Sequence, residues 1–168
     1  FDVDAVVLDD EGGSRRGAEA LLDAGHRRIG YLGNVRSMFT GGRRYAGFAA
    51  AHADRGIPID PRLVPDGQQD VAPARDAMRL LLDLDEPPTA VFCANNRNAI
   101  GAVEEIGRRI RDEGASPHAL PEVVSFDDFE LSDLMPVPVS VLDHDARALG
   151  RTAARLLLDR LAGDTSAP

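Results

Sequence analysis

The sequence predicts an α/β fold in which a parallel sheet is covered by helices on both faces. Short runs of apolar and β-branched residues alternate with longer stretches whose apolar residues recur at helical spacing. The short runs are apolar at nearly every position, as expected for strands that are buried on both sides. Such alternation is typical of a parallel sheet joined by right-handed crossovers.

Six runs are strand candidates: Ala5–Leu8, Ile29–Leu32, Leu63–Val64, Ala90–Cys93, Val123–Phe126 and Val139–Leu142. Between them, apolar residues three and four apart predict helices over 74–82 and 149–161. Two further helices are predicted around 18–22 and 100–110. Gly25 and Gly114 are expected to end them, because glycine readily adopts the left-handed backbone of a helix C-terminus. The small, polar tail 163–168 is expected to fray.

Composition limits the class of protein. A chain of 168 residues is long enough for one domain that carries a pocket. Its 28 acidic and 19 basic residues give a net charge of −9, which repels DNA and anionic membrane surfaces. No apolar stretch approaches the ~20 residues that span a bilayer. The single cysteine, Cys93, lies in an apolar run, so a reducing, cytoplasmic location is expected, without membrane contact.

Polar residues directly follow several strand candidates, where an open α/β sheet binds its ligands. They are Gly33 and Asn34, Gly67 to Gln69, Asn95 and Asn96, and Asp127 and Asp128. Carboxamides, a carboxylate and a nearby arginine suit a small neutral polyol or a purine, because they offer directional donors and acceptors. The alternative is that Asn, Asp and Gly end strands because they form turns.

Catalytic, metal and cofactor sites are not expected. Ser125, Asp127 and His144 are the obvious candidates for a triad, but no Gly-x-Ser-x-Gly elbow surrounds the serine. The four histidines are scattered, so no metal cluster is predicted. The stretch GGSRRG at 12–17 resembles a phosphate loop that opens a helix, but it lacks the Lys-Ser/Thr ending and follows three acidic residues.

Four ordered blocks carry a family resemblance: EGGSRRGAEALLDAGHRRIGYLG, RRYAGFAAAHADRGIPID, PPTAVFCANNRNAIGAV and VVSFDDFELSDLMPVPVSVL. Over nearly the whole chain they resemble the effector-binding domain of LacI/GalR-family transcription regulators. The resemblance implies a periplasmic-binding-protein-like sensor of type I with two α/β subdomains. It also implies a repressor whose N-terminal helix-turn-helix, absent from this chain, reads operator DNA as a homodimer.

The resemblance divides the chain into four parts. Residues 1–24 would be the end of the first sensor subdomain with its crossover helix, and residues 25–138 the C-terminal effector-binding subdomain. Residues 139–162 would be the strand and helix that return to the first subdomain, and 163–168 the tail. The apolar stripe of the last helix would then lack its usual cover. An apolar loop with Leu131, Leu134 and Met135 is expected to support homodimerisation.

The resemblance also implies a small-molecule effector, sugar-like or purine-like, and the residues that bind it. Arg44 matches the arginine that grips the effector, and Asn95 and Asp127 match polar pocket positions. Gln69 and Thr40 match more variable positions. The family commonly has Asn-Asp where this chain has Asn95-Asn96, which leaves the second position without an assigned role.

Two alternatives stay open at this point. A salt bridge between Arg44 and Asp127 could simply hold a loop in place. A sugar-binding protein of an ABC transporter would share the fold and the pocket chemistry, and a secretory signal in place of a helix-turn-helix would distinguish it. The sequence also leaves open whether the effector tightens or loosens DNA binding.

Overall fold

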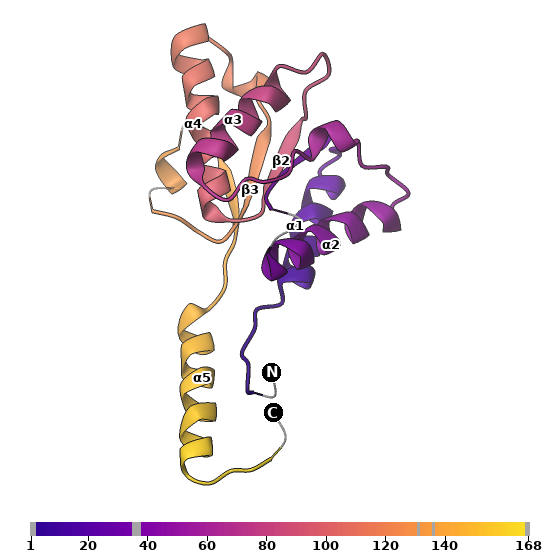
Figure 1. Ribbon diagram of the computed structural model, residues 1–168. Coiled ribbons are helices and arrows are strands. Elements are labelled where there is room, and N and C mark those ends of the chain that lie inside the picture. Colours follow the sequence, from indigo (N-terminus) through magenta and orange to yellow (C-terminus); the bar gives the residue numbers. More distant parts are fainter. Residues whose placement is uncertain (1–2, 35–37, 131, 136, 167–168) are drawn as a thin grey trace. The chain divides into compact units, whose positions relative to one another are not determined.

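The computed structural model describes residues 3–34, 38–130, 132–135 and 137–166. They form two compact units, Asp10–Asp143 and a smaller unit of residues 3–9 with residues 144–166. The larger unit contains a four-stranded parallel sheet in the order β1-β2-β3-β4 (Figure 1). Its strands are β1 (Ile29–Leu32), β2 (Ala90–Cys93), β3 (Glu122–Phe126) and β4 (Val139–Leu142). The parallel sheet expected from the apolar runs is therefore confirmed.

Two of the six strand candidates are wrong. Ala5–Leu8 forms no regular element, and Val3 and Val7 beside and within it are 64% and 69% exposed. A strand needs a neighbour to share its backbone hydrogen bonds, and no described strand lies in this unit. Leu63 ends a short 3₁₀ helix, Pro61–Leu63, which Asp60 caps, and it enters the core as a single buried side chain. The apolar character of Leu63–Val64 reflects this one buried position.

Helices cover both faces of the sheet, as predicted. Helices α1 (Asp10–Asp23) and α2 (Phe39–Asp54) lie on one face, where the ring of Tyr31 in β1 packs 5.0 Å from that of Phe48 in α2. Helices α3 (Val71–Leu82) and α4 (Asn96–Glu113) lie on the other, where Met78 and Ile106 join a core cluster with Val91 of β2. Gly114 ends α4 in the left-handed conformation, at φ 68°, as the sequence indicates.

The apolar spacing of the sequence did not predict helix α2. Its buried residues include Gly41 and Gly47, which carry no side chain that a hydropathy pattern can detect. Phe48, Ala51 and His52, spaced three and four apart, were the available signal. The helix matters here because it carries two of the predicted site residues.

The segment 12–17 lies inside α1 and does not form a loop before a helix. Its glycines let α1 approach the sheet closely. A Cβ on Gly13 would lie 2.9 Å from the ring of Phe126, and one on Gly17 would lie 2.8 Å from the ring of Phe92. The glycine-rich pattern therefore serves helix-to-sheet packing.

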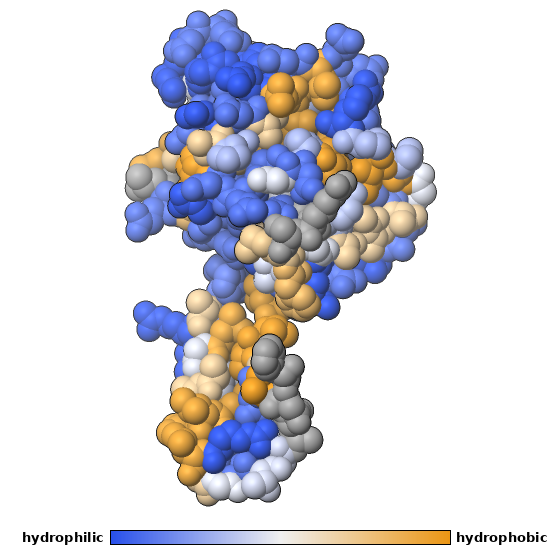
Figure 2. Space-filling view, viewed as in Figure 1, coloured by the Kyte–Doolittle hydropathy of each residue, from blue (hydrophilic) through white to orange (hydrophobic). Residues whose placement is uncertain are grey.

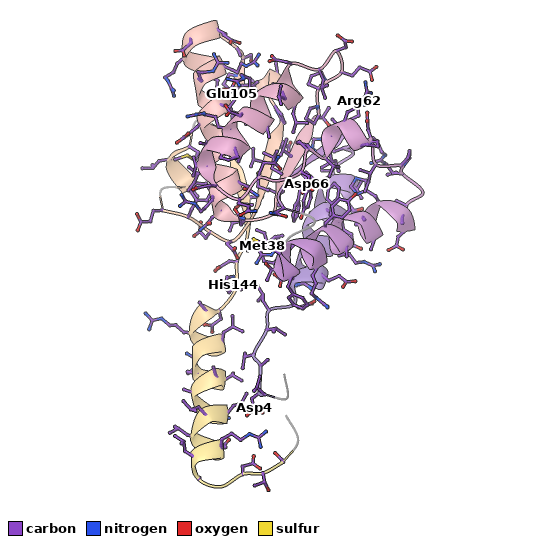
Figure 3. All side chains as sticks on the ribbon, viewed as in Figure 1. Asp4, Met38, Arg62, Asp66, Glu105 and His144 are labelled. Carbon is purple, nitrogen blue, oxygen red and sulfur yellow. The ribbon has the colours of Figure 1, made fainter. Side chains whose placement is uncertain are left out.

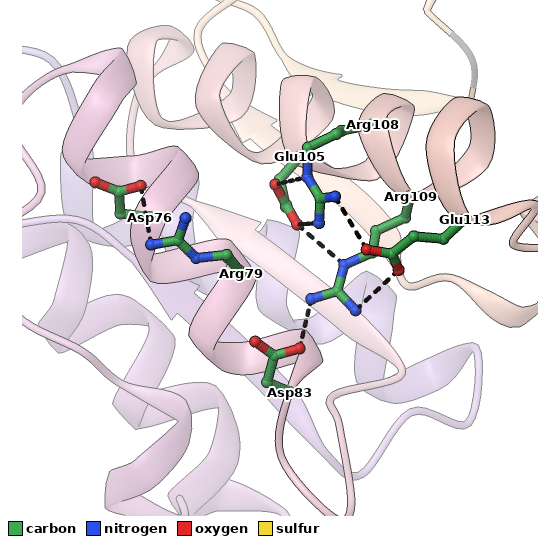
Figure 4. A network of polar contacts seen from close by, with 7 residues as sticks. All are labelled: Asp76, Arg79, Asp83, Glu105, Arg108, Arg109 and Glu113. Atoms are coloured by element: carbon green, nitrogen blue, oxygen red, sulfur yellow. Dashed lines mark hydrogen bonds and ion pairs between the residues drawn. The ribbon is translucent and has the colours of Figure 1, made fainter.

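A network of ion pairs joins α3 to α4 on the outer side of the larger unit (Figure 4). Glu105, 2% exposed, accepts hydrogen bonds from Arg108 (2.6 Å) and Arg109 (3.0 Å), and Arg109 also reaches Asp83 at the end of α3. The hydrogen bonds from Arg108 hold the pKa of Glu105 below its usual range against the opposing effect of burial. A buried carboxylate is tolerated here because two guanidinium groups satisfy it.

The smaller unit consists of an irregular segment and α5 (Ala146–Leu161), linked by a 2.7 Å ion pair between Arg160 and Asp4. No described residue of α5 is buried, and Leu157, Leu158 and Leu161 are 61–75% exposed. Figure 2 shows hydrophobic side chains gathered along this helix. Among the described residues, no helix is both long and apolar enough to cross a membrane.

The structural boundaries fall at 9/10 and 143/144, whereas the sequence placed divisions at 24/25 and 138/139. Helix α1 stays in the larger unit because it packs along α2 and the sheet, and β4 stays there because it pairs with β3. The assignment of these segments to two sensor subdomains stays a prediction.

Candidate effector-binding site

Arg44 of α2 lies at the carboxyl edge of the sheet and is held by three groups. Its Nε donates to Asp10 Oδ1 (2.7 Å), and its Nη1 donates to the carbonyl oxygen of Ala94 (2.6 Å) and to Asp127 Oδ2 (3.3 Å). The guanidinium carbon also lies 3.8 Å from the ring centroid of Phe126. The side chain is only 12% exposed, so the arginine is positioned before any ligand arrives.

Asp127, directly after β3, has a left-handed backbone at φ 73°, the one positive φ among described residues other than glycine. Its N–H donates to the carbonyl of Leu142 in the neighbouring segment (3.2 Å), and its own carbonyl accepts from Ser125 Oγ (2.7 Å). This conformation costs free energy for most residues and is best tolerated by Asn, Asp and Gly. The two hydrogen bonds stabilise the turn that directs the Asp127 carboxylate toward Arg44.

A small concavity brings four of the five predicted residues together. Its lining comes from four segments and comprises Asn34, Met38, Thr40, Gly41, Arg44, Gln68, Gln69, Ala94 and Asn95. Met38 stands at the start of α2, as labelled in Figure 3, and contributes the largest apolar side chain of the set. Asp127 joins this group through its ion pair with Arg44.

The concavity holds about 30 Å³. Small-molecule pockets usually enclose roughly 300–1,000 Å³, so this space cannot surround a sugar or a purine. The residues therefore make one polar wall of a site. A ligand of that size would need a second wall to be buried.

Comparison with known proteins identifies the family. Residues 18–168 match the family model described as periplasmic binding protein-like domain. The chain belongs to this family. The regulator CelR of Thermobifida fusca is 31% identical over 99% of the chain and 48% of its own length, and the repressor PurR of Mannheimia succiniciproducens is 32% identical over 94% and 46%.

Solved structures of LacI-family regulators share the fold of this periplasmic-binding-protein-like chain. A CelR–cellobiose complex superposes with a TM-score of 0.86 at 30% identity, covering 99% of this chain and 50% of the other. A LacI regulator from a Rhodococcus species gives 0.79 at 29% identity, covering 96% and 58%. The resemblance to LacI/GalR-family regulators is therefore confirmed. The alternative of a sugar-binding protein of an ABC transporter is not favoured. The chain spans about half the length of the curated relatives that it matches.

Sequence reasoning missed the closer of the two carboxylates that hold Arg44. Asp10, whose side chain is 4% exposed, was interpreted only as part of an acidic run that repels phosphate. It lies 34 positions from Arg44, and no local pattern links the two. Gln68 was noted after a strand but not chosen, although its side chain accepts from the N–H of Gly33 (3.2 Å) and donates to the carbonyl of Asp66 (3.0 Å).

Asn95 has the local structural role that the turn-forming interpretation predicts, and its role in binding an effector stays a prediction. Its Oδ1 caps α4 by accepting from the N–H of Asn98 (2.9 Å), while the residue also lines the concavity. Asn96, which had no assigned role, donates from Nδ2 to the carbonyl of Asp128 (3.3 Å). Asn96 therefore connects the turn after β2 to the turn after β3.

The structure gives no support to nucleophilic catalysis by Ser125. Its side chain is fully buried, and its hydroxyl donates to the carbonyl of Asp127. His144 belongs to the other compact unit. Within the described parts of the chain, no group of three His, Cys, Asp or Glu side chains could hold a metal ion. The relatives compared are transcription regulators.

Proposed function

We propose that this chain is the effector-sensing part of a LacI-family repressor that binds a small sugar-like or purine-like molecule. The observation that carries the proposal is the convergence of polar side chains around a prepositioned arginine at the edge of the sheet. Arg44 can donate two hydrogen bonds to adjacent hydroxyls or to a ring edge, and Asp127 can accept from hydroxyl or amine groups. Thr40, Gln69 and Asn95 supply further donors and acceptors.

Both ligand classes come from the chemistry of this wall, and one relative supports the sugar class. The regulator CelR is found in complex with cellobiose. Amide, hydroxyl and guanidinium groups suit a polyol and a purine about equally, because both present donors and acceptors at fixed angles. Met38 can pack against the apolar face of either ring.

The mechanism we propose is a hinge shift. The effector binds between this wall and a second sensor subdomain, and it stabilises one hinge state over another. This changes the spacing of two N-terminal helix-turn-helix heads on operator DNA, in the cytoplasm. The coupling expected for such a device is ~1–3 kcal/mol and acts in both directions. The net charge of −9 on this chain agrees with DNA contacts that lie elsewhere.

A thermal-shift screen of the intact protein against neutral sugars and purines tests the proposal. We expect at least one compound to raise the Tm in a concentration-dependent manner, because binding to the native state alone stabilises it. The same compound is expected to change operator affinity in a fluorescence-anisotropy titration. A screen without hits, or hits that leave operator binding unchanged, would contradict the sensing role.

We also propose that the regulator is a homodimer that uses a groove beside α4. The groove of about 650 Å³ is lined by Ile100, Val103, Gly107, Phe129 and Met135, with charged residues of both signs around it: Arg75, Arg108, Arg111, Glu104 and Glu130. A rim with both signs can pair with its own copy across a twofold axis. Leu134, in the predicted apolar loop, is 74% exposed; Leu131 lies outside the described residues.

Leu134→Asp is expected to weaken the dimer at least about tenfold, because a charge would be buried against the second copy. Sedimentation velocity of the intact protein over a concentration series measures this. Leu80→Asp is the matched control, since Leu80 on α3 is also exposed, at 63%, but belongs neither to the groove lining nor to the loop that joins Leu134 to the groove residue Met135. A parent protein that stays monomeric, or equal effects of the two variants, would count against this surface.

A further inference from the structure

The positive charge of Arg44 at the carboxyl edge of the sheet is already neutralised before any ligand binds. Arg44 shares its single positive charge between two carboxylates, Asp10 at 2.7 Å and Asp127 at 3.3 Å. These three side chains are 4–24% exposed, so solvent screens their charges incompletely. The group as a whole carries a net charge of −1.

The neighbouring charges cited on this edge do not offset this negative charge, because Arg97 is paired with Asp70 and Asp128 adds one further negative charge. Arg97, in the first turn of α4, donates to the carboxylate of Asp70 (2.6 Å), which precedes α3. Asp128, beside Asp127, is exposed, and its Oδ1 accepts from the N–H of Phe129 and from Ser132. Among the described residues of this edge, each arginine therefore already has a carboxylate partner.

Helix N-termini act in the opposite direction, because their unpaired N–H groups attract anions. Asp70 and Asn95 already cap α3 and α4 through side-chain oxygens. At the start of α2, by contrast, Met38 caps no N–H with its side chain. The end of a helix is equivalent to about half a charge. The full charge of Asp127 outweighs it, and the α2 N–H groups can equally well donate to a neutral hydroxyl.

We infer that this site accepts uncharged effectors and excludes phosphorylated ones, and that Asp127 is the residue that excludes them. The inference rests on the proposed function and narrows its ligand class. A phosphate at the wall would face Asp127 and find Arg44 already neutralised. A neutral polyol or base meets amide and hydroxyl groups, and it can donate to Asp127.

The test is titration calorimetry of the intact protein with inorganic phosphate and with glucose 6-phosphate at constant ionic strength. The parent protein is expected to show no saturable binding of either that depends on Arg44. Asp127→Asn is expected to bind inorganic phosphate at least about tenfold more tightly than the parent, because it removes one charge a few ångströms from the anion. Asparagine tolerates the left-handed backbone at this position, so the turn is preserved.

Asp128→Asn is the matched control, since it makes the same charge change at the next residue, whose carboxylate accepts from Phe129 and Ser132 and not from Arg44, and it is expected to behave like the parent. The inference is overturned if the parent binds glucose 6-phosphate and Arg44→Ala abolishes that binding. It is also overturned if Asp127→Asn gains no more phosphate affinity than Asp128→Asn. These outcomes are independent of the sugar and purine screen, so failure of the sensing role and failure of charge selection can be told apart.

Discussion

Arg44→Ala is expected to lower the affinity for the effector at least about 100-fold and to abolish its control of operator binding. Two hydrogen bonds from a charged donor contribute ~1.5–3 kcal/mol each, and the lower sum of about 3 kcal/mol already corresponds to more than about 100-fold in Kd. Calorimetry with a compound identified by the thermal-shift screen measures the first effect. Fluorescence anisotropy with labelled operator DNA measures the second.

The same substitution is expected to destabilise the fold, because it leaves the buried Asp10 carboxylate without its cation. Breaking a buried ion pair from one side commonly costs ~3–5 kcal/mol. The double variant Asp10→Asn/Arg44→Gln separates the two effects. It removes both charges and keeps hydrogen-bonding groups, so it is expected to recover much of the stability while effector binding stays weak.

Arg43→Ala is the control for a neighbouring arginine. Arg43 is 47% exposed and forms a surface pair with Glu11 (3.4 Å), so its loss is expected to change stability by less than about 1 kcal/mol and to leave effector affinity unchanged. Normal effector response in Arg44→Ala and in the double variant would show that the assigned wall does not bind the ligand.

Gly47→Ala adds a single methyl group, yet it is expected to lower the free energy of unfolding strongly. A Cβ at this position in α2 would lie 2.0 Å from the carbonyl oxygen of Glu11 and 2.9 Å from the N–H nitrogen of Arg15, both in the backbone of α1. Backbone atoms of a helix cannot rotate away, so α1 and α2 would have to separate. Overpacking of a core commonly costs ~1–3 kcal/mol of stability. We expect a loss of about 3 kcal/mol or more here, because the added methyl group would clash with backbone atoms.

Separation of these helices would also disturb the site, since Asp10 and Arg44 lie within one turn of the contact. Urea denaturation of the intact protein measures the stability. Gly150→Ala is the matched control, because a Cβ on this glycine of α5 meets no atom of the described chain within 4 Å. Alanine there is expected to stabilise by up to ~1 kcal/mol through helix propensity. Similar stabilities of the two variants would disprove the close approach of α1 and α2.

Much of the architecture follows from local sequence. Ile29–Leu32, Ala90–Cys93 and their two counterparts form strands because short apolar runs bounded by polar turns have few other ways to be buried. Gly114 ends α4 in a left-handed conformation, which glycine adopts without the steric cost of a side chain. The positions after the strands were predicted to converge because parallel strands end at one edge. Asn95, after β2, lines the concavity with Arg44, and Asp127, after β3, forms an ion pair with it.

Tertiary structure alone decided the partners. The pairing of Arg44 with Asp10 joins residues on two helices and depends on how closely α1 and α2 approach, which Gly47 permits. Ala5–Leu8 has the composition of a strand, but the described residues of its unit offer no strand for it to pair with, and strand formation requires one. Apolar periodicity indicates which face of a segment is buried. It does not indicate which distant carboxylate pairs with an arginine at the edge of the sheet, and this pairing sets the charge of the site.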